Sequence, residues 1–298
     1  MATLLSGIGL GCQACAGYHA GSAWDGYEET ALLLGKMRLD RRPDGIPVSN
    51  LALADNFRRI AFGTEEDVIG RAPTGHTAPD PRISEGGRLR RWQRPVRWQI
   101  TSLGRGTAEN VRAVTETVER LSEATGHDIA RSGPKEQANF IILFLRPQDY
   151  APAAVALRRQ PGGNFLAAQV DRFGRAANTP CVGLFLHARQ SGTAGMVGDE
   201  ILFGFAIIRD GLPPRLARSC VEEELAQAMG LPNDDPNVRP SIFNDDQEFA
   251  LLTRHDEALL RILYDPRLAP GMTEREAMAI VPRIIEDMDT GVINGRDR

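Results

Sequence analysis

The spacing of apolar residues alternates along the chain between a period of two and a period of 3.6, which predicts a succession of strands and helices. Val96, Trp98 and Ile100 alternate with polar residues as in a half-buried strand, and further strands are predicted at the apolar runs 138–145, 181–187 and 201–208. Helical spacing predicts helices at 27–36, 51–61, 107–125, 151–158, 220–229, 253–264 and 273–287. The order of these elements indicates an α+β fold, with a core of strands and helices that is closed by C-terminal helices.

The helix predicted at 220–229 carries the polar residues of greatest interest. One side of it is apolar, and the other side holds Cys220, Glu223, Glu224 and Gln227. Gly230 can form a left-handed C-terminal cap, and Pro232 prevents the helix from resuming. Two interpretations fit this pattern: an ordinary amphipathic helix with a solvated acidic face, or a helix that builds a functional site.

Composition narrows the class of protein. The chain has 298 residues, 42% of them hydrophobic and 25% charged, so it is globular. Its formal net charge of −4 argues against nucleic-acid binding, because phosphate contacts need a basic surface. No apolar run reaches about 18 residues, so no spanning helix is predicted. A shift to Pro, Gly and charge at 63–87 predicts three parts: an export or lipoprotein-like segment at 1–20, helices and a linker at 21–87, and the main domain at 88–298.

The first twenty residues contain no Lys, Arg, Asp or Glu, which indicates an export signal. Ala14-Cys15-Ala16 fits a small-residue cleavage site, Gly11-Cys12 is similar to a lipoprotein acylation site, and a cytoplasmic N-terminus is the alternative. An exported protein would be periplasmic or anchored in the bacterial envelope, and would keep Cys181 and Cys220 as a pair. Their disulfide would close a loop of about 40 residues and stabilise the fold by roughly 3–4 kcal/mol. Two buried thiols are the alternative.

Several motifs together resemble a proteobacterial family known as domain of unknown function 2927, with members described as lipoproteins. The resemblance covers roughly residues 88 to 272, and it is carried by Cys-Val-Glu-Glu-Glu-Leu-Ala-Gln-Ala-Met-Gly-Leu-Pro-Asn at 220–233 and by the stretches 241–245, 252–256, 263–266 and 270–272. The family name implies no activity.

The same stretch is more remotely similar to the active-site helix of the metzincin zinc peptidases, His-Glu-x-x-His-x-x-Gly-x-x-His or Asp. In that resemblance Glu224 stands at the general base, while Glu223, Gln227 and Asn233 replace the three zinc ligands and Phe243 replaces the methionine beneath the metal. The resemblance implies a metzincin-like mixed sheet. Two amide ligands suit zinc poorly, whereas an oxygen-rich set that includes Asp234 suits calcium better, although calcium takes six or more ligands.

Two functions follow from these residues. The first is an exported, non-catalytic relative of a metallopeptidase, without a cofactor, whose cleft binds a peptide or an envelope protein and which meets the membrane only through an N-terminal lipid anchor. The second is an active metallopeptidase in which zinc or calcium activates water and Glu224 accepts its proton, because without a metal the water pKa stays too high.

Overall fold

The computed structural model describes residues 23–43, 46–63, 87–160, 163–188, 199–244 and 246–288. Its elements in chain order are α1 (Ala23–Leu33), α2 (Asn50–Phe62), β1 (Arg91–Trp92), β2 (Val96–Arg105), α3 (Ala108–Thr125), β3 (Ile129–Arg131), β4 (Phe140–Leu145), the 3₁₀ turn η1 (Pro147–Asp149), α4 (Tyr150–Arg158), α5 (Asn164–Arg175), β5 (Cys181–His187), β6 (Glu200–Arg209), α6 (Pro214–Gln227), α7 (Arg254–Tyr264), α8 (Glu274–Met278) and α9 (Val281–Asp287). The predicted export segment and the interior of the predicted linker lie outside the described residues.

The strands form one mixed sheet in the order β1-β6-β4-β2-β3, with β5 added to β6. β5 is antiparallel to β6, whereas the other pairs are parallel. The central strands β4 and β6 are almost wholly apolar, as expected for strands covered on both faces. The α+β class predicted from the sequence is therefore confirmed.

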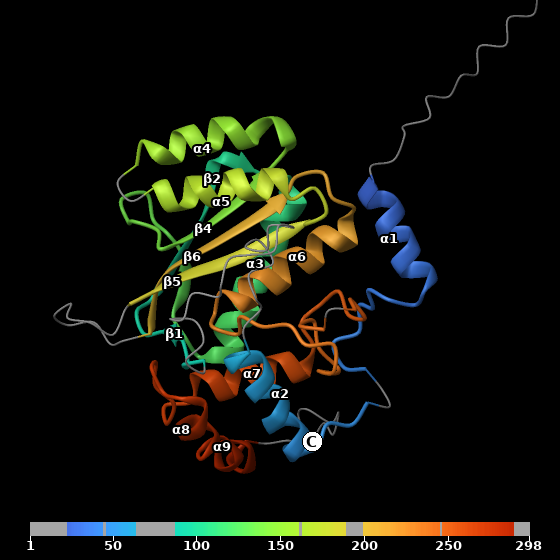
Figure 1. Ribbon diagram of the computed structural model, residues 1–298, viewed down its shortest axis with the longest axis vertical. Helices are drawn as coiled ribbons and strands as arrows, with labels where there is room; N and C mark the ends of the chain where they lie inside the picture. The colour runs from blue at the N-terminus through green and yellow to red at the C-terminus, as the bar shows by residue number, and fades with distance from the viewer. Residues whose placement is uncertain are drawn as a thin grey trace, which may run out of the picture.

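Helices cover both faces of the sheet (Figure 1). α4 and α5 pack on one face around a smaller apolar cluster, and α3 and α6 pack on the other around the main core. α7 lies against α3, and α2 and α9 pack against α7 and against each other. Because the sheet, α3, α7 and the C-terminal helices share one continuous core, α6 is enclosed by other elements for most of its length.

Two sequence predictions about helices need correction. The helix predicted at 273–287 is two helices, α8 and α9, and Pro282 lies in the first turn of the second, where its missing N–H is tolerated. The helix α5 was not predicted, although Ala167, Val170 and Phe173 have helical spacing and are buried. None of the described helices is both long and apolar enough to cross a membrane.

Candidate functional site

α6 lies along the edge strand β5 and is bound to it covalently. The Cys181–Cys220 disulfide joins the first residue of β5 to the middle of α6, with a Cα–Cα distance of 5.8 Å. Both cysteines are buried. The predicted disulfide is thus confirmed.

The polar side of α6 is buried rather than solvated. Glu222, Glu224 and Gln227 are 0%, 6% and 9% exposed. This contradicts the interpretation of α6 as a surface helix with an acidic face in water. The helix pattern could not reveal it, because the elements that cover these side chains come from distant parts of the chain.

Glu222 is the anion of a buried charge cluster. Its carboxylate accepts two hydrogen bonds from Arg41 at 2.7 Å, one from Arg218 Nε at 2.7 Å and one from the backbone N–H of Leu252 at 2.8 Å. Arg218 also donates to Glu116 of α3. The cluster ties the segment after α1, α6 and the start of α7 together. Sequence reasoning missed Glu222, because nothing near it in the sequence marks its partner Arg41.

Glu224, the predicted general base, lies against the edge strand at Gly183. A Cβ atom at Gly183 would come within 2.8 Å of a Glu224 carboxylate oxygen and 2.7 Å of its backbone oxygen. Only glycine lets strand and helix approach this closely. The Glu224 carboxylate therefore lies next to the edge strand β5.

Glu223 faces a different neighbour from Glu224. The pKa of Tyr27, on α1, is raised first by burial and then by the negative charge of Glu223. The Tyr27 hydroxyl donates to Gln247 at 2.6 Å. Glu223 therefore lies on the side of α6 toward α1.

The other two predicted ligand positions make contacts at the end of α6. The Gln227 side-chain amide donates to both carboxylate oxygens of Asp234, at 3.0 and 3.1 Å. The Asn233 amide donates instead to the backbone oxygen of Arg59 at 2.9 Å, so it holds the last turn of α2. The structure thus brings Gln227 and Asp234 together and directs Asn233 toward α2. The described residues contain no group of three or more His, Cys, Asp or Glu placed to hold a metal. Metal binding through Glu223, Gln227 and Asn233 stays a prediction.

Phe243 lies in a buried turn next to the loop that follows α6. Its backbone oxygen accepts from Asp235 N at 3.0 Å, and its N–H donates to Ser241 Oγ at 3.0 Å. Asp256 fixes this turn by accepting from Ser241 Oγ at 2.5 Å and from Ile242 N at 3.0 Å. Asp256 also forms a capping box with Thr253, the N-cap residue of α7.

Among the described strands, β5 pairs with β6 alone, so its other edge borders no described strand. Pro180 and Ala188 both hydrogen-bond toward β6, and the backbone groups of successive strand residues point to opposite edges. The even-numbered residues of β5 therefore face β6, whereas Gly183 and Phe185 turn their N–H and C=O groups outward. Such an edge can accept a further strand.

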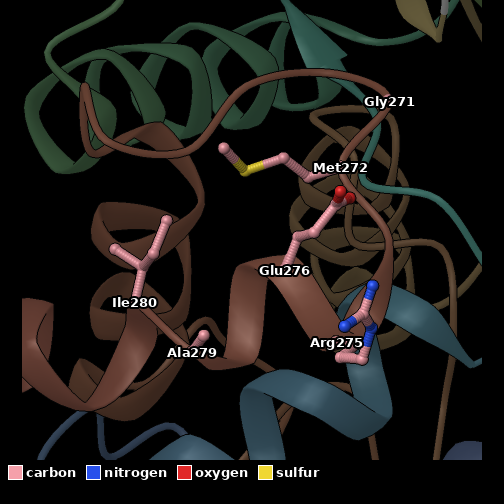
Figure 2. A pocket seen from close by; sticks show the side chains of 6 residues that line it. All are labelled: Gly271, Met272, Arg275, Glu276, Ala279 and Ile280. Atoms are coloured by element: carbon pink, nitrogen blue, oxygen red, sulfur yellow. The ribbon is translucent and has the colours of Figure 1, made fainter.

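Two other recesses lie away from these residues. One of about 680 Å³ is lined by Gly271, Met272, Arg275, Glu276, Ala279 and Ile280, with Met272 and Ile280 reaching into it (Figure 2). A smaller one, of about 240 Å³, lies between the first turns of α3 and α6. Neither is lined by a predicted site residue.

Comparison with known proteins gives a family. A family model described as "Protein of unknown function (DUF2927)" matches residues 50–283, from the start of α2 into α9. No curated protein matches the chain. The match confirms the resemblance inferred from the motifs around α6, and it begins earlier in the chain, so that α2 is included.

Proposed function

Because the chain belongs to the family described as "Protein of unknown function (DUF2927)", a description that names no activity, we propose its function from the site itself. The protein is an exported, non-catalytic, metallopeptidase-like module, and it binds an extended segment of a peptide or of an envelope protein along the outer edge of β5. The observation that carries the proposal is the edge of β5 that borders no other described strand, in a strand that the Cys181–Cys220 disulfide holds against α6.

The backbone groups along this edge of β5 suit the addition of a further strand. A peptide added to β5 gains backbone hydrogen bonds from Gly183 and Phe185, whose polar groups face outward. The order of elements also supports likeness to a metallopeptidase: the edge strand β5 is followed by β6, by α6 with Glu224, by the buried turn at Phe243, and by α7. The disulfide supports export, because disulfides persist in oxidising compartments such as the periplasm. An N-terminal lipid anchor would place the module at the envelope membrane.

The placement of Glu224 favours a second candidate function. Its carboxylate borders the edge along which the peptide would lie. In an active metallopeptidase Glu224 would accept a proton from water, and zinc or calcium would supply the Lewis acid that makes the water acidic. The fit of such a metal to Glu223, Gln227 and Asn233 is poor, since two of the three are amides and the Asn233 amide group donates to Arg59. Non-catalytic binding is therefore the function that we favour.

Amide hydrogen exchange tests the binding proposal residue by residue. A dodecapeptide selected from a random phage library on the disulfide-intact protein would be added at saturation, and exchange followed by NMR. We expect slower exchange at Gly183 and Phe185, and little change at Leu184 and Leu186, whose N–H groups already face β6. Absence of added protection at the two outward amides would exclude binding at this edge.

Hydrolysis is tested separately with casein as the substrate. Protein purified without chelators would be assayed for metal content and turnover, together with Glu224→Gln and the exposed control Glu109→Gln. We expect no turnover in any of the three. Stoichiometric metal, with activity that is lost in Glu224→Gln and kept in Glu109→Gln, would instead establish the peptidase.

A further inference from the structure

We infer that the end of α1 inserts into the lipid bilayer of the envelope, through the three consecutive leucines Leu32, Leu33 and Leu34. The inference goes beyond peptide binding along β5, and it rests on the proposed function only for the location of the protein at the envelope membrane. Of the nine large apolar side chains that are exposed in the described part of the chain, five lie between residues 27 and 39. Exposed apolar side chains that gather in this way mark a surface of interaction.

The three leucines lie at the C-terminal end of α1 and are 38%, 83% and 68% exposed. Gly35 ends the helix with a φ of 70°, and its N–H donates to the backbone oxygen of Leu32 at 3.0 Å. The next N–H, of Lys36, donates to the backbone oxygen of Ala31 at 2.9 Å. These two hydrogen bonds are those of a Schellman cap, so the turn that carries the leucines is closed on itself. Figure 1 shows α1 at the margin of the molecule.

Buried contacts hold this turn on both sides. Ala31, before it, is 8% exposed, and Met37, after it, is 0% exposed. The Met37 N–H donates to the backbone oxygen of Gln247 at 2.8 Å. α1 itself is fixed by Glu28, whose carboxylate accepts from the N–H of Leu216, in the first turn of α6, at 2.7 Å. The leucines are therefore exposed on a turn whose two ends are packed into the protein.

The directions of the three side chains favour a bilayer over a second protein. Successive residues of a helix point about 100° apart, so three consecutive leucines spread over about 200° around its end. A flat protein surface could cover only part of this arc, whereas acyl chains can surround all of it. Burial of leucine side chains is favourable, and the apolar side chains of peripheral proteins enter the boundary between headgroups and acyl chains to a depth of about 5–10 Å.

The length of chain before α1 keeps this helix near the membrane. With the lipid predicted at Cys12, only ten residues, 13–22, separate the anchor from Ala23, the first residue of α1. Ten residues span at most about 36 Å even when fully extended, so the start of α1 stays within that distance of the bilayer. Insertion of the leucines would therefore add a second membrane contact to the lipid anchor.

Charge contributes little to this contact. Residues 30–39 contain two basic side chains and no acidic one. Both basic side chains are paired, Lys36 with Asp246 at 3.3 Å and Arg38 with Asp40. The surface around the leucines is thus close to neutral, and insertion depends on apolar burial. Binding should need no anionic lipid and change little with salt, which screens only charged groups.

Vesicle sedimentation tests the inference. The full-length protein would be mixed with phosphatidylcholine vesicles at low and high salt, together with Leu33→Ser/Leu34→Ser and the control Leu51→Ser. Leu51 is 81% exposed but lies in the first turn of α2. We expect the wild type and the control to bind alike at both salt concentrations, and the double variant to bind about 100-fold more weakly, about tenfold for each leucine. A wild type that stays in solution, or a double variant that binds as the wild type does, would overturn the inference.

A tryptophan variant keeps the test decisive if the serine variant folds poorly. The added tryptophan of Leu33→Trp should be quenched by vesicles with brominated acyl chains, and that of Leu51→Trp should not. Equal quenching of the two would overturn the inference. So would a wild type that dimerises in light scattering and loses its dimer in the double serine variant, because a second copy would then cover the leucines.

These outcomes are independent of those at β5. Peptide protection of the Gly183 and Phe185 amides without vesicle binding would overturn this inference alone. Vesicle binding without that protection would overturn only the proposal of peptide binding.

Discussion

Replacing Glu222 by alanine should destabilise the protein strongly, although this side chain is absent from the surface. The carboxylate accepts four hydrogen bonds, two of them from Arg41, and is 0% exposed. Without it, the buried Leu252 N–H has no acceptor, and the half-buried Arg41 guanidinium loses its two hydrogen bonds to Glu222. Arg41 keeps one bond to the backbone oxygen of Leu252, and Arg218 keeps Glu116.

The magnitude follows from the groups left behind. Removing one partner of a buried ion pair costs about 3–5 kcal/mol, and a single unsatisfied buried N–H costs about 1–3 kcal/mol. Since Arg41 is 20% exposed and keeps one partner, we expect a loss of about 4 kcal/mol in the free energy of unfolding for Glu222→Ala. Glu222→Gln keeps an acceptor oxygen and the side-chain volume, so a loss of about 2 kcal/mol is expected.

Urea unfolding followed by far-ultraviolet circular dichroism measures these losses. The slope of the free energy of unfolding against urea concentration should be the same in all variants, so that the shift of the midpoint reports the change in stability. Glu286→Ala is the matched control, because Glu286 pairs with Arg283 on the exposed surface of α9 and should change stability by less than about 1 kcal/mol. A loss below about 1 kcal/mol for Glu222→Ala would refute the inference that this cluster holds three parts of the chain together.

Three further predictions concern the neighbourhood of α6. Replacing Cys181 and Cys220 together by alanine should lower the free energy of unfolding by roughly 3–4 kcal/mol, and labelling of Cys181 or Cys220 itself without reductant, located by peptide mapping, would contradict the disulfide. Gly183→Ala should cost about 1–3 kcal/mol in urea unfolding, because the new Cβ overlaps Glu224; an unchanged midpoint would show that α6 moves away freely. Burial raises the pKa of Tyr264, so its phenol keeps its proton in the folded state above pH 10, where an unfolded tyrosine loses it. The contribution of Tyr264 to stability should therefore be complete below pH 10 and be lost as the pH rises above it. The fall should be less steep in Tyr264→Phe. Tyrosinate absorbance at 295 nm would count the phenols that ionise before unfolding.

Local patterns in the sequence predicted the elements whose signals lie within a few residues. Thr107 caps α3 and Gly126 ends it with a φ of 66°, as its place after the apolar stripe suggests. The apolar runs at β4 and β6 are central strands because few other structures bury every side chain of such a run. These features depend on local backbone geometry and on the burial of neighbouring side chains, and a short stretch of sequence is enough to predict both.

The candidate site was predicted less completely, because its contacts join distant segments. The burial of Glu222 depends on Arg41, which lies 181 residues earlier. The Asn233 amide was aligned with a metal ligand, yet it donates to Arg59 of α2, a helix that the sequence separated from the main domain by a linker. Helical spacing identifies the faces of α6, but the elements that pack over the helix determine which of its polar side chains are shielded from water.

The Cys181–Cys220 bond joins β5 to α6 covalently by a path other than the peptide backbone. The ring that it closes, with a sequence separation of 39, contains the whole of β6. A protease that cuts the peptide backbone between β5 and β6 would therefore leave one molecule, with both halves of the sheet still joined. Such a nicked protein would migrate as a single species in a denaturing gel and separate into two fragments only after reduction. An intact backbone is thus not required for β5 to remain fastened to α6.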